Sequence, residues 1–419
     1  MVGTLLPCLL ILIYFILTWK WRSDFEDQLR ELKEDGRPHS IQSLKNIYKK
    51  RFPVRKDYYD WKLPNQLQKL NNKIIQSNIP DDWMYKSKKK RIRHAKTILE
   101  LVNNFKNPLF SQLKKSIYPS RHKLSLGLDA PVSHIVNRQT ESKIFLYYAL
   151  SLIVTGKLRK AIPIVRNIYN RGRILRKNPY IISFLVSNIF TSRANEAVKY
   201  ILQRPELPDE TISIFEHGSP QTIKKDLLFA FESDLVIKAY EIRRTIKANY
   251  SHLSSKPNIE MPKYFPHELL WLSASNFVQR YRKCLKLFGE PYYITKNKLE
   301  GCSSVQSNLY NKYFRFFSSE FLPSFVSLYE IANDSKAKMD LNLLAVKAKL
   351  RSQGEQNRLI PIPDLDESTD PYSGKPYKVK EVKSHIILYS VGENLKDDGG
   401  SIKGKKGEEP KDVGVKIRK

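Results

Sequence analysis

Residues 144–169 read IFLYYALSLIVTGKLRKAIPIVRNIY, and this stretch decides the fold of the chain. On both sides of Gly156 its apolar residues return at the three- and four-residue spacing of an α-helix. Ala149, Gly156 and Ala161 are small residues where two antiparallel helices would cross, and larger residues such as Phe145 lie beside them. The stretch therefore predicts a helical hairpin.

Helical periodicity also runs from Ile98 to Phe105 and over residues 180–192, whereas strand-type alternation is nearly absent between residues 95 and 355. We therefore expect a helical domain over residues 95–355 in a mainly α-helical protein. The hairpin resembles one tetratricopeptide repeat, but a stable stack of such repeats needs about three copies. A pair of packed helices is therefore favoured over a repeat array.

The N-terminal stretch, residues 2–19, carries no charge and reads VGTLLPCLLILIYFILTW. About 18 apolar residues are just enough to cross a hydrocarbon core of about 30 Å. Trp19 and Trp21, with Lys20 and Arg22, form an aromatic and basic edge suited to the headgroup region. No basic region precedes the stretch and no small-residue cleavage site follows it, so we predict a retained transmembrane helix.

Residues 20–94 are predicted to form a charged stalk followed by a basic, aromatic segment. Phe25, Leu29 and Leu32 share one stripe of a short helix that ends at Gly36. Positive charge is densest farther along, at Lys86, Lys88, Lys89, Lys90, Arg91 and Arg93. We predict that these six residues bind an anionic surface.

The basic, aromatic segment has three interpretations. Basic residues interleaved with aromatic ones can contact phosphates and stack on bases. Beside a membrane anchor they can lie along anionic headgroups, or they can simply begin a solvated helix. The chain holds 73 Lys plus Arg against 42 Asp plus Glu, a net charge of +31, which favours an anionic partner. That excess is spread over the chain, as a lysine-rich composition alone would also give.

The three cysteines, Cys8, Cys284 and Cys302, are too few for a disulfide scaffold. Cys284 and Cys302 can pair if this part of the chain faces an oxidising compartment. Two free, buried thiols are the alternative, and the sequence favours it.

The strong sequence signatures of enzymes are missing. The chain has no GxxxxGK[ST], GxGxxG, GxSxG, CxxC or HExxH motif. Its eight histidines are scattered without the spacing of metal ligands. We therefore expect a protein that is not an enzyme.

The C-terminal segment, residues 360–419, has a different composition, because seven of the 16 glycines lie in the last 46 residues. Asp370-Pro-Tyr-Ser-Gly374 reads as a turn. Strands are predicted over residues 377–382, 385–391 and 413–417, which together make a small antiparallel sheet.

A Gly- and Lys-rich loop of about 20 residues separates the last two predicted strands. Asp397, Asp398 and Asp412 would meet at one end of the sheet, and they offer the hard oxygen ligands that Ca²⁺ prefers. The sequence thus predicts a calcium site at these three residues. A solvated polar loop is the alternative, because the nearby lysines weaken the field around a cation.

The tail resembles the C-terminal segment of type II secretion pseudopilins. The shared features are the Asp370-Pro turn with Gly374, the strand ending in Tyr389-Ser-Val-Gly392, and the Asp- and Gly-rich loop closed by Asp412-Val. In the major pseudopilins this loop holds calcium. The N-terminus departs from the pattern, because no basic leader, processing glycine or early glutamate surrounds Gly3, so the chain is not itself a pilin subunit.

The whole chain is similar to a family of membrane-anchored bacterial envelope proteins that end in such a segment. The resemblance implies a protein anchored in the inner membrane, with its body in the periplasm and an envelope protein as partner. We expect a binding or scaffolding role, with secretion as one setting. The alternative is a basic protein facing the cytoplasm that binds nucleic acid or anionic membrane through residues 45–93. Nucleic acid is the less expected partner, while the positive-inside rule favours a cytoplasmic body.

Overall fold

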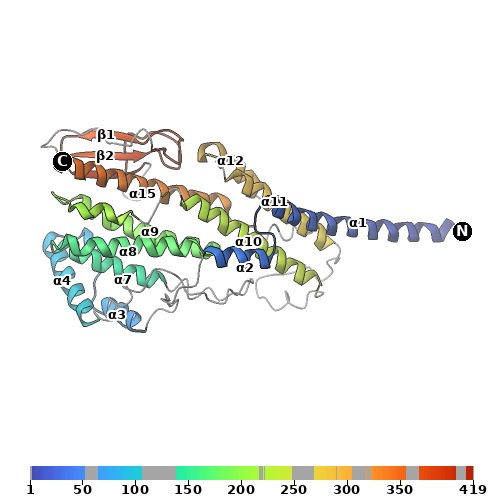
Figure 1. The fold of residues 1–419 in the computed structure, drawn as a ribbon, viewed down its shortest axis with the longest axis horizontal. Coiled ribbons are helices and arrows are strands. Elements are labelled where there is room, and N and C mark those ends of the chain that lie inside the picture. Colours follow the sequence, from blue (N-terminus) through green and yellow to red (C-terminus); the bar gives the residue numbers. More distant parts are fainter. Residues whose placement is uncertain are drawn as a thin grey trace.

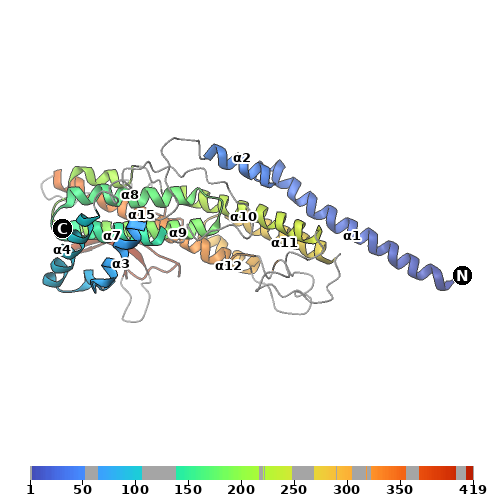
Figure 2. The same ribbon diagram turned by 90° about the horizontal axis from the view of Figure 1, so that it is seen from below.

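The computed structural model is mainly helical, with a small antiparallel sheet at the C-terminus, which confirms the predicted fold class at this level (Figure 1). It describes residues 2–51, 65–105, 138–216, 220, 222–247, 269–288, 290–303, 318, 322–354, 368–402 and 412–418, with side chains in the first helix from residue 12 on. The helices lie mostly along one long axis, and the N-terminal half of α1 projects beyond the rest (Figure 2).

Helix α1 (Val2–Glu34) is continuous, so the predicted short charged helix is its second half. Phe25, Leu29 and Leu32 are buried, as their stripe predicts. They belong to the face that packs along α11 (Leu269–Leu287), where the rings of Phe25 and Trp271 lie 5.6 Å apart. The second half of α1 is therefore part of the helical body.

The predicted hairpin is confirmed as α7 (Arg138–Val154) and α8 (Leu158–Arg176). Gly156 has a φ of +79°, a left-handed conformation that favours glycine and ends α7. Ala149 and Ala161 are fully buried where the helices pack. Helix α9 (Ile181–Leu202) then packs against both, and α10 (Thr222–Lys247) and α15 (Phe325–Gly354) extend the body with longer helices.

The remaining helices are α2 (Ile41–Arg51), α3 (Asn65–Gln76), α4 (Lys88–Asn104) and α12 (Tyr292–Ser303), with short 3₁₀ helices η1 (Trp83–Tyr85) and η2 (Asp209–Ile214). Helices α3 and α4 lie at the end of the molecule opposite the N-terminus of α1 (Figures 1 and 2). Helix α2 packs on α10, where the buried Leu44 contacts the cluster of Phe229 and Ile237.

Strands β1 (Lys378–Val382), β2 (His385–Ser390) and β3 (Val413–Arg418) form an antiparallel sheet in the order β1-β2-β3. Their bounds match the predicted strands to within one residue at each end. The sheet packs on α15 and α9, and Leu388, Val415 and Ile417 join the main hydrophobic core. The tail is thus docked on the helical body.

Over the residues that the structure describes, none of the helices contains a stretch long and apolar enough to cross a membrane. The transmembrane helix expected over residues 2–19 stays a prediction.

Candidate functional site

The six basic residues predicted to bind an anionic surface lie together at η1 and the start of α4. Lys88, Lys89, Lys90 and Arg93 are exposed, and Arg91 is half-buried. Lys86 forms an ion pair with Asp82, with 2.6 Å between its ammonium nitrogen and the carboxylate oxygen. The structure therefore brings the predicted cluster together at the end of the molecule opposite the N-terminus of α1 (Figure 1).

Among the described residues of the basic, aromatic segment (residues 45–93), some of the aromatic rings are buried and do not join the surface of this cluster. Tyr48 is buried, and its hydroxyl donates a 3.3 Å hydrogen bond to the side-chain oxygen of Asn178, which lies between α8 and α9. Trp83 is fully buried. Tyr85 is exposed. Residues 52–64 lie outside the described part. Two of the aromatic rings that could have stacked on bases are thus core residues.

A cavity of about 190 Å³ adjoins the basic cluster, between the start of α4 and the last turns of α7 and α9. Lys88 and Arg91 of α4 border it together with Arg204, which follows α9. The Arg204 guanidinium donates a hydrogen bond to the carbonyl oxygen of Ile153. Burial and the nearby charge of Arg91 lower the pKa of Arg204. The cavity is strongly cationic, and sequence reasoning missed Arg204 because it is far from α4 in the chain.

A groove of about 860 Å³ between α1 and α11 has a different charge balance. Its lining includes Asp24, Asp27 and Glu31 of α1 and Arg282, Lys283 and Lys286 of α11. Arg282 and Glu31 form an ion pair at 2.6 Å. With Lys20, the lining holds four basic and three acidic residues, so acidic and basic side chains face each other and their charges nearly balance.

The three carboxylates predicted to bind calcium lie near one end of the sheet and accept hydrogen bonds. Asp412 accepts from the backbone amides of Asp398, Gly400 and Ser401, at 3.4, 2.9 and 2.8 Å. The side chain of Asp398 accepts a 2.7 Å bond from the Asn394 amide.

Asp397 is bound at 2.6 Å by the Lys378 ammonium, which lowers the pKa of its carboxyl. It also accepts from the Tyr389 hydroxyl at 3.1 Å. Among the described residues, no group of three or more His, Cys, Asp and Glu is placed to hold a metal ion. The calcium site at Asp397, Asp398 and Asp412 stays a prediction.

The turn that opens the tail is organised by Asp370, which is 1% exposed. Its carboxylate accepts hydrogen bonds from the Ser390 and Ser373 hydroxyls at 2.7 and 2.8 Å, and from the Tyr372 amide at 3.0 Å. Gly374, at a φ of +70°, completes the turn, and a side chain there would meet the Tyr293 ring. The Asp-Pro-Tyr-Ser-Gly pattern thus builds a turn that binds the end of β2.

Tyr372 of this turn and Tyr377, which directly precedes β1, hold the tail on the helices. The Tyr377 hydroxyl donates to Asp340 of α15 at 2.9 Å. The Tyr372 ring lies 5.1 Å from that of Tyr292 in α12. Every residue of the pattern named here therefore has a structural role in docking the sheet.

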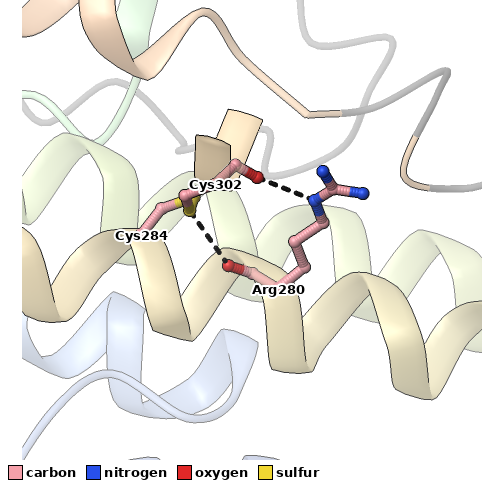
Figure 3. Close-up of a disulfide and its surroundings, with 3 residues drawn as sticks. All are labelled: Arg280, Cys284 and Cys302. Atoms are coloured by element: carbon pink, nitrogen blue, oxygen red, sulfur yellow. Dashed lines mark hydrogen bonds between the residues drawn. A yellow bond between two sulfur atoms is a disulfide. The ribbon is translucent and has the colours of Figure 1, made fainter. Parts of the chain in front are cut away.

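Cys284 and Cys302 form a disulfide with their Cα atoms 5.8 Å apart (Figure 3). The bond joins α11 to α12, and the Arg280 side chain donates a 2.7 Å hydrogen bond to the Cys302 carbonyl oxygen beside it. Both cysteines are buried. The preference for two free thiols was wrong, because the packing of α12 on α11 places the two residues within bonding distance.

A buried ion-pair cluster lies between α7 and α8. The Glu141 carboxylate accepts from Arg138 at 3.0 Å and from Arg171 at 2.7 Å, and all three side chains are at most 3% exposed. Arg171 also donates to Asn167. The i, i+3 spacing of Arg138 and Glu141 is the only sequence signal for this cluster.

Comparison with known proteins finds no match to a family model, a curated protein or a solved structure. The similarity of the tail to pseudopilins therefore stays a prediction, and function has to be argued from the geometry alone.

Proposed function

We propose that the protein is a membrane-anchored scaffold of the cell envelope, with α1 as its anchor and its body in the periplasm. The observation that carries the proposal is a row of apolar side chains on the projecting half of α1, between 39% and 72% exposed: Leu12, Ile13, Tyr14, Phe15, Ile16, Leu17 and Trp19. Six consecutive residues exceed the 3.6 of one helical turn, so the apolar surface surrounds the helix. A helix that is apolar all round requires a non-aqueous environment.

The boundary between the exposed and the packed part of α1 supports a membrane surface at this point. The first charged residue, Lys20, and Trp21, which packs partly against the core, follow the apolar row directly. The Arg22 guanidinium lies 5.7 Å from the centre of the Trp271 ring of α11. Aromatic and basic residues at this level suit the headgroup region.

The Cys284–Cys302 disulfide supports a body in an oxidising compartment, because such bonds persist there and are rare in the cytosol. For a bacterial protein anchored in the inner membrane, that compartment is the periplasm. The basic residues that follow the anchor, Lys20, Arg22, Arg30 and Lys33, favour the opposite orientation by the positive-inside rule. The disulfide outweighs them in this proposal, because it bears directly on the compartment of the folded body.

The position of the basic cluster supports a binding role away from the anchor. Helix α4 lies at the far end of the long axis from α1 (Figure 2), so Lys88 to Arg93 are directed away from the bilayer that would hold α1. An acidic surface on an envelope protein fits this end better than the headgroups next to the anchor. The buried Tyr48 and Trp83 count against stacking on nucleic acid.

A reporter fused after Lys419 tests the orientation. An enzyme active only in the periplasm, such as an alkaline phosphatase, should be active, and a cytoplasm-dependent fluorescent reporter should be dark. The reverse pattern would leave the alternative, a basic protein that faces the cytoplasm and binds nucleic acid or anionic membrane through residues 45–93.

A further inference from the structure

We infer that the cavity bordered by Lys88, Arg91 and Arg204 is a binding site for an oxyanion of phosphate or carboxylate type. This inference rests on the proposal that the basic end is a binding surface and names its ligand class. It is independent of the membrane anchor.

The charged side chains that border the cavity are all cationic. Its three cationic side chains come from two separate parts of the chain, and its lining contains no aspartate or glutamate. None of the three forms an ion pair with a carboxylate in the described part of the chain. Like charges held close together without a counter-ion are unfavourable, and the charge of Arg91 adds to burial in lowering the pKa of Arg204. A bound anion would relieve this repulsion.

Two basic residues near the cavity differ, because each forms an ion pair with an aspartate. Lys86 binds Asp82 at 2.6 Å, and Lys143 of α7 binds Asp81 at 2.7 Å. In the groove between α1 and α11, acidic and basic residues face each other. The excess of positive charge at this cavity is therefore a local feature and not only a consequence of the net charge of the chain.

The donors suit an oxyanion. A guanidinium has five N–H donors in a planar fork that matches two oxygens of a phosphate or carboxylate. Arg204 uses one N–H group on the Ile153 carbonyl, which fixes its side chain and leaves the others for a ligand. Lys88 and Arg91 are three residues apart and thus share one face of α4.

The rest of the lining suits a ligand with a small apolar body. Met84, Ile92, Ile153 and Val154 are apolar, while Tyr200 and Gln203 add polar groups. A volume of about 190 Å³ is far above the roughly 15 Å³ that one water molecule needs. An organic phosphate or an acidic side chain of a partner protein both present the required head group.

The test is a thermal-shift and calorimetric titration of the full chain in detergent, at constant ionic strength, with inorganic phosphate, phenyl phosphate, benzoate and chloride. We expect phosphate or benzoate to bind and chloride not to. A larger response to phenyl phosphate than to benzoate would indicate a phosphate ligand, and the reverse would indicate a carboxylate ligand. Binding should weaken about tenfold or more in Arg91→Gln, since losing one charge-assisted hydrogen bond removes at least about 1.4 kcal/mol, which is a factor of about ten.

The matched control is Lys89→Gln with Arg93→Gln, which removes more charge from exposed positions outside the cavity lining. It should bind the oxyanion nearly as well as the wild-type chain. Equal weakening in the control and in Arg91→Gln, or the same response to chloride as to phosphate, would overturn the site. Arg204→Lys, which keeps the charge but loses the fork, should weaken binding as Arg91→Gln does, and unchanged binding there would also overturn it.

The oxyanion site and the proposed scaffold function can fail independently of each other. If the oxyanion binds but no acidic envelope protein is crosslinked to the basic end in cells, the cavity stands and the scaffold role falls. If such a partner binds equally well to the wild-type chain and to Arg91→Gln, the scaffold role stands and the cavity is not its ligand site.

Discussion

The Ser390 hydroxyl donates a 2.7 Å hydrogen bond to the buried Asp370 carboxylate, and this bond joins the first turn of the tail to the last residue of β2. The two residues belong to two of the three segments in which the tail resembles pseudopilins. Their contact shows why a turn of the Asp-Pro-Tyr-Ser-Gly kind and a strand ending in Tyr-Ser-Val-Gly occur together. The pair is explained by folding of the sheet alone, so it does not by itself indicate a role in secretion.

Asp370→Ala is expected to lower the free energy of unfolding by about 3 kcal/mol, because it leaves the buried Ser390 hydroxyl and Tyr372 amide without their acceptor. Urea unfolding followed by circular dichroism measures the change. Glu393→Ala, exposed in the same tail, should change it by less than about 1 kcal/mol. Similar values for both variants would show that Asp370 does not organise the turn.

Glu141→Ala is expected to lower the free energy of unfolding by about 3–5 kcal/mol, because it leaves the buried guanidinium groups of Arg138 and Arg171 without this carboxylate. Glu100→Ala, at an exposed position on α4, is the control. Chemical denaturation of both variants measures the change in the free energy of unfolding. A loss below about 1 kcal/mol for Glu141→Ala would contradict a buried ion-pair cluster between α7 and α8.

The disulfide predicts a simple count of thiols. Of the three cysteines, two are in the bond, so one should react with a maleimide in the unfolded, unreduced chain, and all three after reduction. Cys284→Ser should lower the free energy of unfolding by about 3 kcal/mol. Three reactive thiols in protein taken from cells with alkylation at harvest would place the body in a reducing compartment.

Lys349 gives stability a specific pH dependence. Its ammonium group is buried, which lowers its pKa to about 8, and it donates to the Leu202 carbonyl oxygen at 2.8 Å. Between about pH 8 and the usual lysine value near 10.4, the unfolded chain holds more protons than the folded one. The free energy of unfolding therefore gains up to about 1.4 kcal/mol per pH unit in this window.

Lys349→Met removes that contribution. The free energy of unfolding of the wild-type chain should therefore rise relative to that of the variant between pH 7.5 and 10. Urea titrations at several pH values measure this difference. A difference that stays constant across the range would contradict the assignment.

Calcium binding at Asp397, Asp398 and Asp412 is tested by thermal unfolding with calcium and with a chelator. A metal that binds only the folded chain stabilises it by about 2.7 kcal/mol at a hundredfold excess over its Kd. The prediction is a raised midpoint that Asp397→Ala abolishes. Identical midpoints would leave these carboxylates as acceptors for Lys378, Asn394 and backbone amides.

Local signals in the sequence were enough to predict the helical hairpin and the strands. Gly156 marks the end of α7 because its backbone is left-handed there, and turn residues bound each strand of the tail. The burial of Phe25, Leu29 and Leu32 followed from their spacing. Such features depend on residues within a few positions of one another, so a single sequence carries them.

The features that join distant segments were not predictable in this way. The cavity brings Arg91 together with Arg204, and the disulfide depends on how α12 packs against α11. The burial of Tyr48 and Trp83 likewise depends on helices far along the chain. Charge and aromatic content in the sequence therefore located the basic cluster but could not tell which rings are buried.

The central claim is that α1 holds the protein in a membrane, and alkaline carbonate extraction of membranes from cells that express the full chain tests it most directly. We predict that the wild-type chain stays in the membrane pellet, while a variant with Leu12→Asp, Phe15→Asp and Ile16→Asp is released. Recovery of the wild-type chain in the supernatant would contradict the claim.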